Sequence, residues 1–447
     1  MTELPDPHAI AAVRALAIPL REDDPHDALL DLVGDAELVL LGEASHGTHE
    51  FYRERARITQ RLLAEKQFQA VAIEGDWPDA YRVNRYVRGV GSDNSAAQAL
   101  EGFKRFPTWM WRNTEVVAFV EWQRARNAGL PPPARTGFYG LDLYSMHSSM
   151  AAVLAHLEAA DPEAARQVRE RYGCFDRFGE DSQVYGLMTG LRGADSCEQA
   201  VRATLADLRH RAAAAQPDIA DTEAAFDAAQ NALLVKNAEA YYRSMYLSDV
   251  SSWNLRDLHM AETLGQLQAH LQRQSGHGQT RPKIVVWAHN SHLGDARATE
   301  MGQRRGEMNL GQLVRERHGA RALLVGFSTY TGSVAAASDW GAAAQRMQVV
   351  PARPDSHEGV MHASGVARFL LPLRGARPLV FSKPRLERAI GVIYRPETER
   401  MSHYFHAELG AQFDALIHLD TTRALEPLER GTGWRDAEAP ATYPAGV

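Results

Sequence analysis

The segment GEASHGTHE, residues 42–50, gathers two histidines and two carboxylates into one short stretch. A histidine can take a proton from water near neutral pH, because its unperturbed pKa is about 6.5. A neighbouring carboxylate can fix the tautomer of such a histidine and stabilise the imidazolium that forms. The segment therefore has the groups that general-base catalysis requires, with Glu43 and His46 three residues apart.

Polar side chains also follow other apolar runs of the chain. Glu74 ends the run QAVAIE and is followed by Asp76 and Trp77, while Asp142 and Tyr144 follow a later run. The carboxyl ends of parallel strands meet at one edge of a sheet, where open α/β folds bind their ligands. We therefore expect these side chains near the first segment, with the last four in contact with substrate.

A third apolar run, KIVVWA at 283–288, leads into His289 and His292. A second histidine in a cleft could protonate a leaving group or donate a hydrogen bond to an oxyanion. Three strand ends that carry such groups are consistent with hydrolysis of a small-molecule ester, or of a similar bond, by an activated water.

The elements that must position these residues show an α/β pattern. Strands near 37–41 and 69–74 flank a helix at 50–65, and such a βαβ unit predicts a parallel pair. We predict a central, mostly parallel sheet flanked by helices, with a large helical insertion or lid that forms a deep cleft. Further strands are expected at these places: 136–141, 283–288, 321–327, 378–382, 390–394 and 413–419.

Composition shifts divide the chain into parts. The expected parts are an N-terminal helical preface at 1–35, an α/β core at 36–144 and 280–425, a helical insertion at 145–279 and a surface tail at 426–447. In the preface, short helices are expected around 8–16 and 26–33. Residues 345–375 are expected to form loops and one short helix.

Within the helical insertion, apolar residues recur every three or four positions and predict an amphipathic helix; they are Leu255, Leu258, Ala261, Leu264, Leu267 and Leu271. The segments 237–246 and 251–260 carry unusual polar density, typical either of a solvated, salt-bridged helix face or of a functional one. An irregular stretch at 91–135 holds an aromatic cluster that fits either a pocket wall, with Trp109 contacting substrate, or core packing; its members are Phe103, Phe106, Trp109, Trp111 and Trp122.

Charge and composition disfavour several classes of protein. The chain of 447 residues has a net charge of −7 and no basic run, which argues against nucleic acid or an anionic membrane as partner. No apolar stretch is long enough for a membrane span, and no signal peptide is recognisable, so we expect a cytoplasmic protein. Cys174 and Cys197 are expected to be ordinary free thiols. The sequence makes no prediction about oligomeric state.

Several segments together resemble the erythromycin esterase family, over about residues 40 to 420. They are GEASHGTHEFYRER (42–55), AIEGDW (72–77), GLDLYS (140–145), NAEAYYR (237–243), SWNLRD (252–257), WAHNSH (287–292) and HYFHAELGAQFDALIHLD (403–420). The resemblance implies a cofactor- and metal-independent hydrolase with an α/β core, a large helical part and a deep cleft. It implies that the macrolactone ring of a macrolide antibiotic is the substrate, and hence a role in antibiotic resistance, although many relatives have unknown substrates.

The resemblance also implies roles for individual residues. His46 would be the base that activates water, Glu43 would orient it, and Glu74 and His289 would assist. The polar site would be completed by His292 and Arg55.

Three other interpretations remain open. The sequence E-A-S-H-G around Ser45 is one residue away from the G-x-S-x-G nucleophile elbow, although Glu43 is bulky for that turn and Ser45 cannot easily use the adjacent His46. A metal hydrolase could use the H-x-x-H pairs His46/His49 and His289/His292, if they converge with carboxylates. A non-catalytic protein could bind a polyketide or glycoside in the same cleft. Nucleotide binding is disfavoured, because neither a P-loop nor a strand-linked G-x-G-x-x-G is present.

Overall fold

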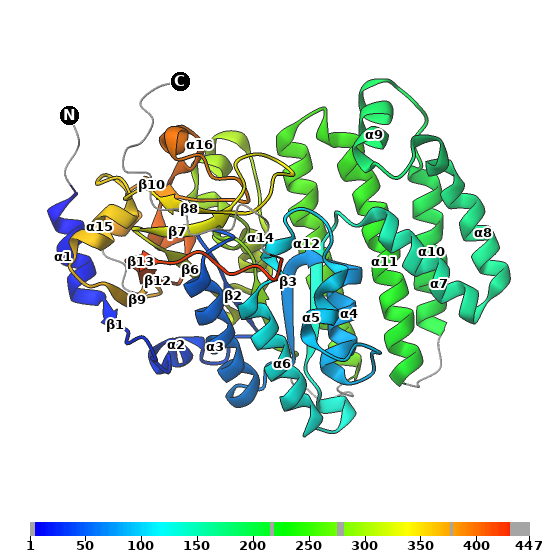
Figure 1. The fold of residues 1–447 in the computed structure, drawn as a ribbon, viewed down its shortest axis with the longest axis horizontal. Helices are drawn as coiled ribbons and strands as arrows, with labels where there is room; N and C mark the ends of the chain where they lie inside the picture. The colour runs from blue at the N-terminus through cyan, green and yellow to red at the C-terminus, as the bar shows by residue number, and fades with distance from the viewer. Residues whose placement is uncertain (1–4, 215–218, 275–280, 376–378, 430–447) are drawn as a thin grey trace.

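The computed structural model describes residues 5–214, 219–274, 281–375 and 379–429. Its centre is an eight-stranded sheet in which six neighbouring strands are parallel, and the seventh strand runs antiparallel to both the sixth and the short edge strand (Figure 1). This confirms the predicted α/β fold with a mostly parallel sheet. In spatial order the strands are β1 (Ile18–Pro19), β9 (Arg368–Pro372), β12 (Ala415–Leu419), β6 (Ala322–Ser328), β2 (Leu38–Leu41), β5 (Ile284–Trp287), β3 (Ala70–Asp76) and β4 (Gly137–Asp142).

The central strands are apolar on both faces because helices cover both faces. Every residue of β2, with the sequence LVLL, and of β5, with the sequence IVVW, is buried. Alternate residues of β2 enter two different cores, so that Leu38 and Leu40 face one and Val39 and Leu41 face the other. Such uninterrupted apolar runs are typical of parallel strands buried on both faces.

The strands β2 and β3 are parallel but are not neighbours, which corrects the predicted pairing. Strand β5 lies between them and pairs with both. The helix α3 (His49–Glu65) therefore crosses over one strand position that is filled only much later in the chain. As a consequence, the histidines that follow β5 lie between the polar ends of β2 and β3.

Helices flank the two faces of the sheet (Figure 1). The face that holds Val39 is covered mainly by α2 (Asp27–Val33), α3, α4 (Trp77–Arg88), α5 (Ala96–Ala99) and α6 (Thr114–Ala128). The opposite face is covered by α1 (Pro7–Leu16), α14 (Leu310–His318), α15 (His357–Ala363) and part of α12 (Asp249–Gln274). Short helices elsewhere are α13 (Asn290–Leu293), α16 (Glu399–Ser402) and α17 (Leu409–Gln412).

The expected helical insertion is a bundle beside β4 (Figure 1). Its helices are α7 (Met146–Ala160), α8 (Pro162–Tyr172), α9 (Ser182–Gly186), α10 (Glu198–Ala214), α11 (Ile219–Met245) and α12. Cys174 and Cys197 form a disulfide within it, with Cα atoms 5.9 Å apart, so the expectation of free thiols is wrong. The fold around α9 brings together two cysteines that are 23 residues apart, which their spacing alone does not reveal.

The amphipathic stripe predicted for α12 holds only in its second half. Leu264, Leu267 and Leu271 are buried, but Leu258 is 40% exposed. In the first half the buried face is polar instead and includes Asp257 and His259. This half of the helix packs against the polar edge of the sheet, so the apolar period is interrupted there.

Several predictions for the stretches outside the strand core are wrong. Residues 91–135 are not irregular, because Asn113 caps α6 by accepting a hydrogen bond from the Val116 N–H at 2.9 Å, and the helix then packs on the core. Residues 379–382 form a 3₁₀ turn, whereas residue 378 lies outside the described residues. Residues 390–394 form only isolated bridges. The strand at 413–419 is confirmed as β12.

Two small sheets lie beside the central sheet, and one of their strands falls in the stretch 345–375 that was expected to form loops. One contains β13 (Thr421–Thr422), β7 (Thr331–Ala336) and β8 (Gln345–Val349), and the other contains β10 (Arg385–Arg388) and β11 (Tyr404–Ala407). The short helix expected in 345–375 is α15, but β8 and β9 were missed because their residues alternate weakly. Residues 430–447, most of the expected tail, lie outside the described residues. Within the described ranges, no helix has the length and apolar character needed to cross a bilayer.

Candidate active site

The turn after β2 holds a three-membered chain of charged and titratable groups. Nδ1 of His46 lies 2.9 Å from Oε1 of Glu43, and Nη2 of Arg55 lies 2.8 Å from the other carboxylate oxygen. The hydroxyl of Tyr52 donates to the carbonyl of His46 at 2.9 Å. Because Glu43 and Arg55 are almost fully buried, their attraction is poorly screened, and the glutamate is fixed where it can orient the imidazole.

The same turn is locked to the neighbouring strands by Asn290. Its backbone N–H donates to the carbonyl of Glu43 at 2.8 Å, and its side-chain amide donates to the carbonyl of Phe327 at 2.7 Å. A Cβ atom at Gly42 would lie 2.1 Å from Oδ1 of Asn290. The glycine is therefore required for the close approach of the ends of β2, β5 and β6.

Glu74, at the end of β3, joins the other two polar strand ends. Its Oε2 accepts a hydrogen bond from the backbone N–H of His289 at 2.8 Å, and its Oε1 accepts one from Arg256 Nη2 at 2.7 Å. Burial opposes the ionisation of Glu74, but His292, His46 and Arg256 outweigh it and hold the pKa of this carboxyl well below its usual range. A buried carboxylate therefore lies between the two histidine-bearing turns.

His292 is held by carboxylates on two sides and by a ring. Its Nδ1 lies 2.9 Å from Oδ2 of Asp257, and its Nε2 lies 3.3 Å from Oε1 of Glu74. The indole of Trp253 stacks on the imidazole with centroids 4.6 Å apart. Burial opposes the positive charge, but the two carboxylates outweigh it and raise the pKa of His292 to about 9. Nη1 of Arg256 lies 3.0 Å from Nε2 and its charge opposes protonation, but the raised pKa still favours the imidazolium at neutral pH.

His289 has the opposite charge preference. Burial, together with the nearby His46, lowers the pKa of His289 to about 3, so its ring is neutral at pH 7. The centroids of the two rings are 4.8 Å apart. The backbone N–H of Ser291 donates to Nδ1 of His289 at 3.2 Å, which places the ring proton on Nε2. That nitrogen is buried, and the backbone carbonyl of Ala44 is an acceptor next to it within the protein.

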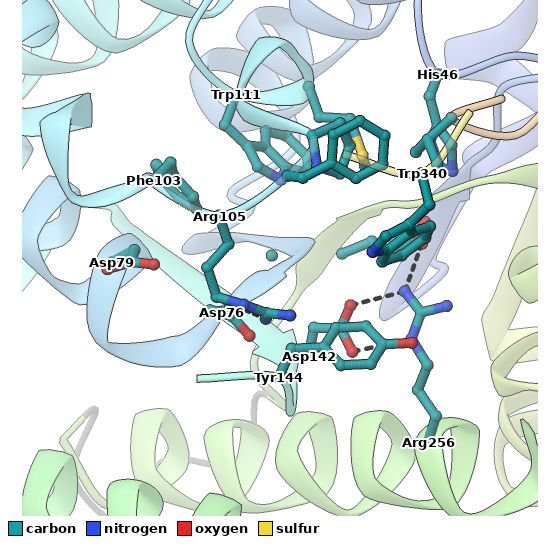
Figure 2. A pocket seen from close by; sticks show the side chains of 16 residues that line it. His46, Asp76, Asp79, Phe103, Arg105, Trp111, Asp142, Tyr144, Arg256 and Trp340 are labelled. Carbon is teal, nitrogen blue, oxygen red and sulfur yellow. Dashed lines mark hydrogen bonds and ion pairs between the residues drawn. The ribbon is translucent and has the colours of Figure 1, made fainter. Parts of the chain in front are cut away.

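Two cavities meet at His46, Glu74 and Arg256, which line both. The one that we call the aromatic cavity has a volume of about 230 Å³, and ring-bearing and acidic side chains surround it (Figure 2). The other, called here the histidine cavity, has a volume of about 500 Å³. Besides the shared residues, the aromatic cavity is lined by Asp76, Asp79, Phe103, Arg105, Phe106, Trp111, Asp142, Tyr144 and Trp340, and the histidine cavity by Trp253, His289, His292, Met401, His403, Tyr404 and Phe405.

Three of the predicted substrate contacts, Trp77, Trp109 and Arg55, lie elsewhere. Trp77 points toward the helical bundle, where its Nε1 donates to Asp227 at 2.8 Å, and Trp109 packs edge-on against Phe106. Neither indole lines either cavity. Arg55 lies behind Glu43 rather than in a cavity. The pattern of strand ends could not separate side chains that point into the cleft from those that point into the core.

The sequence analysis did not assign Arg256 or Asp257 to the site. Arg256 forms a bidentate pair with Asp142, at 2.9 and 2.7 Å, besides its bond to Glu74. Both residues come from the segment 251–260, whose many polar residues pointed to a functional helix face. The other interpretation, a solvated and salt-bridged face, is wrong for these two residues. Arg105 and Trp340 were also missed, since they lie on irregular segments without a recognisable pattern.

The positions of Ser45 and His49 are relevant to two of the open alternatives, the serine hydrolase and the metal hydrolase. The hydroxyl of Ser45 is buried and hydrogen-bonds to that of Thr48, and no contact with a histidine is found among the described residues. His49 turns away from the site and lies 3.3 Å from Glu115. Within the described residues, no three or more His, Cys, Asp or Glu side chains are grouped as a metal site.

The fold and the site define an α/β protein with a histidine–carboxylate centre at the carboxyl edge of its parallel sheet. The family model for erythromycin esterase matches residues 63–422. The chain belongs to the erythromycin esterase family, a family of hydrolases. The match begins after the segment that holds His46, so it is independent of the site residues there.

Individual relatives are distant but cover nearly the whole chain. Erythromycin esterase type II of Escherichia coli is 22% identical over 90% of this chain and 94% of its own length. A crystal structure of a Bacillus cereus protein superposes with a TM-score of 0.74 at 19% identity, covering 94% of this chain and 99% of that one. A mutant of the erythromycin esterase EreC in its open conformation superposes with a TM-score of 0.63 at 18% identity, over 89% and 93% of the two chains.

Proposed function

We propose that the protein hydrolyses a carboxylic ester, with the macrolactone of a macrolide as the first candidate, by means of a water activated by His46. The observation that carries this proposal is the pairing of His46 Nδ1 with Glu43, at the meeting point of two cavities. This pairing directs the other nitrogen, Nε2, to the water. Among the described residues, no hydrogen bond to that nitrogen is found.

In the first step His46 removes a proton from water as the oxygen attacks the ester carbonyl carbon. Glu43 stabilises the imidazolium, and Arg55 holds the Glu43 carboxylate in place. The neutral His289 offers the N–H of its Nε2 to the oxyanion of the tetrahedral intermediate. When the intermediate collapses, the proton on His46 passes to the leaving alkoxide, so that one water and one ester give an acid and an alcohol.

Glu74, Arg256 and His292 form a cluster of charged side chains next to the proposed reaction site. Their mutual contacts hold the turn of His289 in place through its backbone N–H. The mechanism assigns no step to a metal ion. A metal-dependent hydrolase would lose its activity after chelator treatment, whereas this mechanism predicts that activity remains. A non-catalytic binding protein would show no turnover.

The test is mass spectrometry of erythromycin after overnight incubation with purified, chelator-treated protein. We expect the mass of one added water, and we expect no change with His46→Ala. Recovery of unchanged macrolide by the wild-type protein would remove it as a substrate. A panel of simple esters, assayed with and without added divalent metal, then tests the ester hydrolysis itself. Activity that returns only with metal would contradict the proposed mechanism.

A further inference from the structure

The segment 389–392 runs along the junction of the two cavities. The N–H of His46 donates to the carbonyl of Ile390 at 3.3 Å, and the N–H of Ile390 donates back to a carbonyl of the same turn at 2.8 Å. The segment is thereby fixed to the turn that carries the proposed base. Two consecutive residues of the segment line different cavities, because Gly391 lines the histidine cavity and Val392 lines the aromatic cavity.

The two residues leave different amounts of space. A Cβ atom added at Gly391 would have no atom within 4 Å, so the wall of the histidine cavity is open at this point. The side chain of Val392 packs on the core, and its carbonyl accepts a hydrogen bond from the Ala337 N–H at 2.9 Å. The volume of the aromatic cavity is about 230 Å³, against about 500 Å³ for the histidine cavity. The aromatic cavity is therefore the more restrictive of the two.

Each cavity reaches the surface of the molecule on its own. Trp340, which lines the aromatic cavity, is 62% exposed, and Met401, which lines the histidine cavity, is 83% exposed. In the view of Figure 2, the residues of the aromatic cavity extend from His46 at one end to Asp79 and Phe103 at the other. An ester bond held at His46 can therefore extend one of its two sides into each cavity.

The charges on the walls differ between the cavities. Besides the shared residues, the acidic and basic side chains of the aromatic cavity are three carboxyls and one guanidinium, namely Asp76, Asp79, Asp142 and Arg105. The charged side chains of the histidine cavity are an imidazolium, a guanidinium and a carboxylate, namely His292, Arg305 and Glu307. Carboxyl groups thus outnumber cations in the first cavity, and cations outnumber carboxylates in the second.

We propose that the acyl portion of the ester lies in the histidine cavity, next to Gly391, and that the alcohol portion lies in the aromatic cavity, next to Val392. The inference rests on the proposed function, since it takes the ester bond to lie at His46. Hydrolysis turns a neutral ester into a carboxylate, which belongs to the acyl portion, and a neutral alcohol. A carboxylate that left through the aromatic cavity would be repelled by its aspartates, whereas an alcohol would not.

This orientation makes the two neighbouring residues the determinants of size. Gly391 leaves room for a long acyl group, and Val392 limits the alcohol group to a compact one. Ring-bearing side chains surround the smaller cavity, so an apolar alcohol group fits it best. The expected substrates are esters that join a compact, apolar alcohol to a longer acyl chain.

The first experiment uses two isomeric esters that carry the same ring on opposite sides of the ester bond, benzyl acetate and methyl phenylacetate. The ratio of their kcat/KM values, the first over the second, should fall at least about 10-fold in Val392→Phe and rise at least about 10-fold in Gly391→Phe. Gly265→Phe, on the exposed side of α12, is the control and should leave the ratio unchanged. Shifts in the opposite directions, or an unchanged ratio in both cavity variants, would overturn the inference while leaving ester hydrolysis standing.

A second experiment depends neither on turnover nor on the variants. Calorimetry on the wild-type protein should show that phenylacetate and benzyl alcohol bind at the same time, so that saturation with one changes the Kd of the other by less than about 3-fold. If the protein hydrolyses neither ester, the proposed function fails, but simultaneous binding still supports two separate sides. Mutual exclusion of the two ligands would overturn the inference.

The same titrations on the variants assign each ligand to its cavity. Val392→Phe should weaken the binding of benzyl alcohol, and Gly391→Phe that of phenylacetate, by at least about 10-fold. A thermal melt of each variant shows that it is folded, and the smaller changes Val392→Leu and Gly391→Val replace a variant that is not. Weakening of the opposite ligand in each variant would contradict the orientation.

Discussion

The carboxylate of Glu43 lies between His46 and Arg55, 2.9 Å from the imidazole Nδ1 and 2.8 Å from the guanidinium. This geometry gives the glutamate one partner to orient, His46, and one partner that holds it in place, Arg55. It also leaves the opposite side of the imidazole toward the cavities.

Replacing His46 by alanine should lower kcat by at least about 100-fold, the usual scale for loss of a general base. The free energy of unfolding should change little, because the imidazole makes one side-chain hydrogen bond, at the edge of a cavity. Steady-state kinetics on the best ester, with denaturant unfolding, measure both effects. His49→Ala is the matched control, since His49 pairs with Glu115 outside both cavities, and it should retain activity. Near-wild-type turnover by His46→Ala would remove the mechanism.

Replacing Glu74 by glutamine should lower kcat/KM by at least about 10-fold and the free energy of unfolding by about 3 kcal/mol. The substitution leaves Arg256 and His292 with one buried counter-charge fewer. Kinetics and chemical unfolding of the same preparation provide the two readouts. Glu50→Gln is the control, because Glu50 pairs with the largely exposed Arg423 and should have only a small effect. Full activity of the Glu74 variant would show that the carboxylate is dispensable.

The free energy of unfolding should fall as the pH rises from about 6.5 to 9. His292 has a folded-state pKa of about 9, above the unfolded value of about 6.5, so the folded protein binds more protons in this window. The stabilisation is complete below pH 6.5, and its loss by pH 9 is up to about 3 kcal/mol. His289, with a pKa of about 3, does not titrate there in the folded state.

Urea unfolding at several pH values checks this dependence. The His292→Gln variant supplies the reference, because it lacks the titrating group while keeping similar volume. The difference in slope between wild type and variant isolates the contribution of His292. Parallel pH profiles for the two proteins would contradict the assigned protonation state.

Replacing Gly42 by alanine should reduce the free energy of unfolding by about 1–3 kcal/mol and lower kcat. The new Cβ would collide with the Asn290 side chain, which ties the ends of the central strands together. Gly265→Ala is the control: Gly265 lies on the exposed side of α12 with nothing within 4 Å of an added Cβ. That substitution should be neutral or stabilise the protein by up to about 1 kcal/mol. A stable, active Gly42 variant would mean that Asn290 is not needed to close the strand ends.

The central strands could be predicted because a run of apolar residues can be recognised from neighbouring positions of the sequence alone. The runs LVLL and IVVW are too apolar to lie anywhere but between two layers of helices. The small sheets of the C-terminal third could not be predicted in this way. Their strands are partly exposed, and some pair with partners far along the chain, as in the pairing of Thr331 with Thr421.

The polar residues that follow the strands could also be recognised in the sequence, but the order of those strands in the sheet could not. Glu43, Glu74 and His289 were expected at one edge from the direction of parallel strands alone. Their order along that edge depends on β5 being inserted between β2 and β3, a crossover that no local pattern encodes. Arg256 and Asp257 come from the far end of the helical insertion and could be placed only once α12 was packed.

The sequence by itself determined that Glu43, Glu74 and His289 follow apolar strands, because residue type and apolar periodicity are properties of neighbouring residues. Only the tertiary structure decided the protonation states of the site residues and the direction in which each side chain points. His289 and His292 lie three residues apart, yet one is neutral and the other is an imidazolium. Burial lowers the pKa of both rings, but Asp257, from a distant helix, outweighs it at His292, whereas His46 adds to it at His289. Electrostatic interactions act through space, so protonation follows from the packing of the chain.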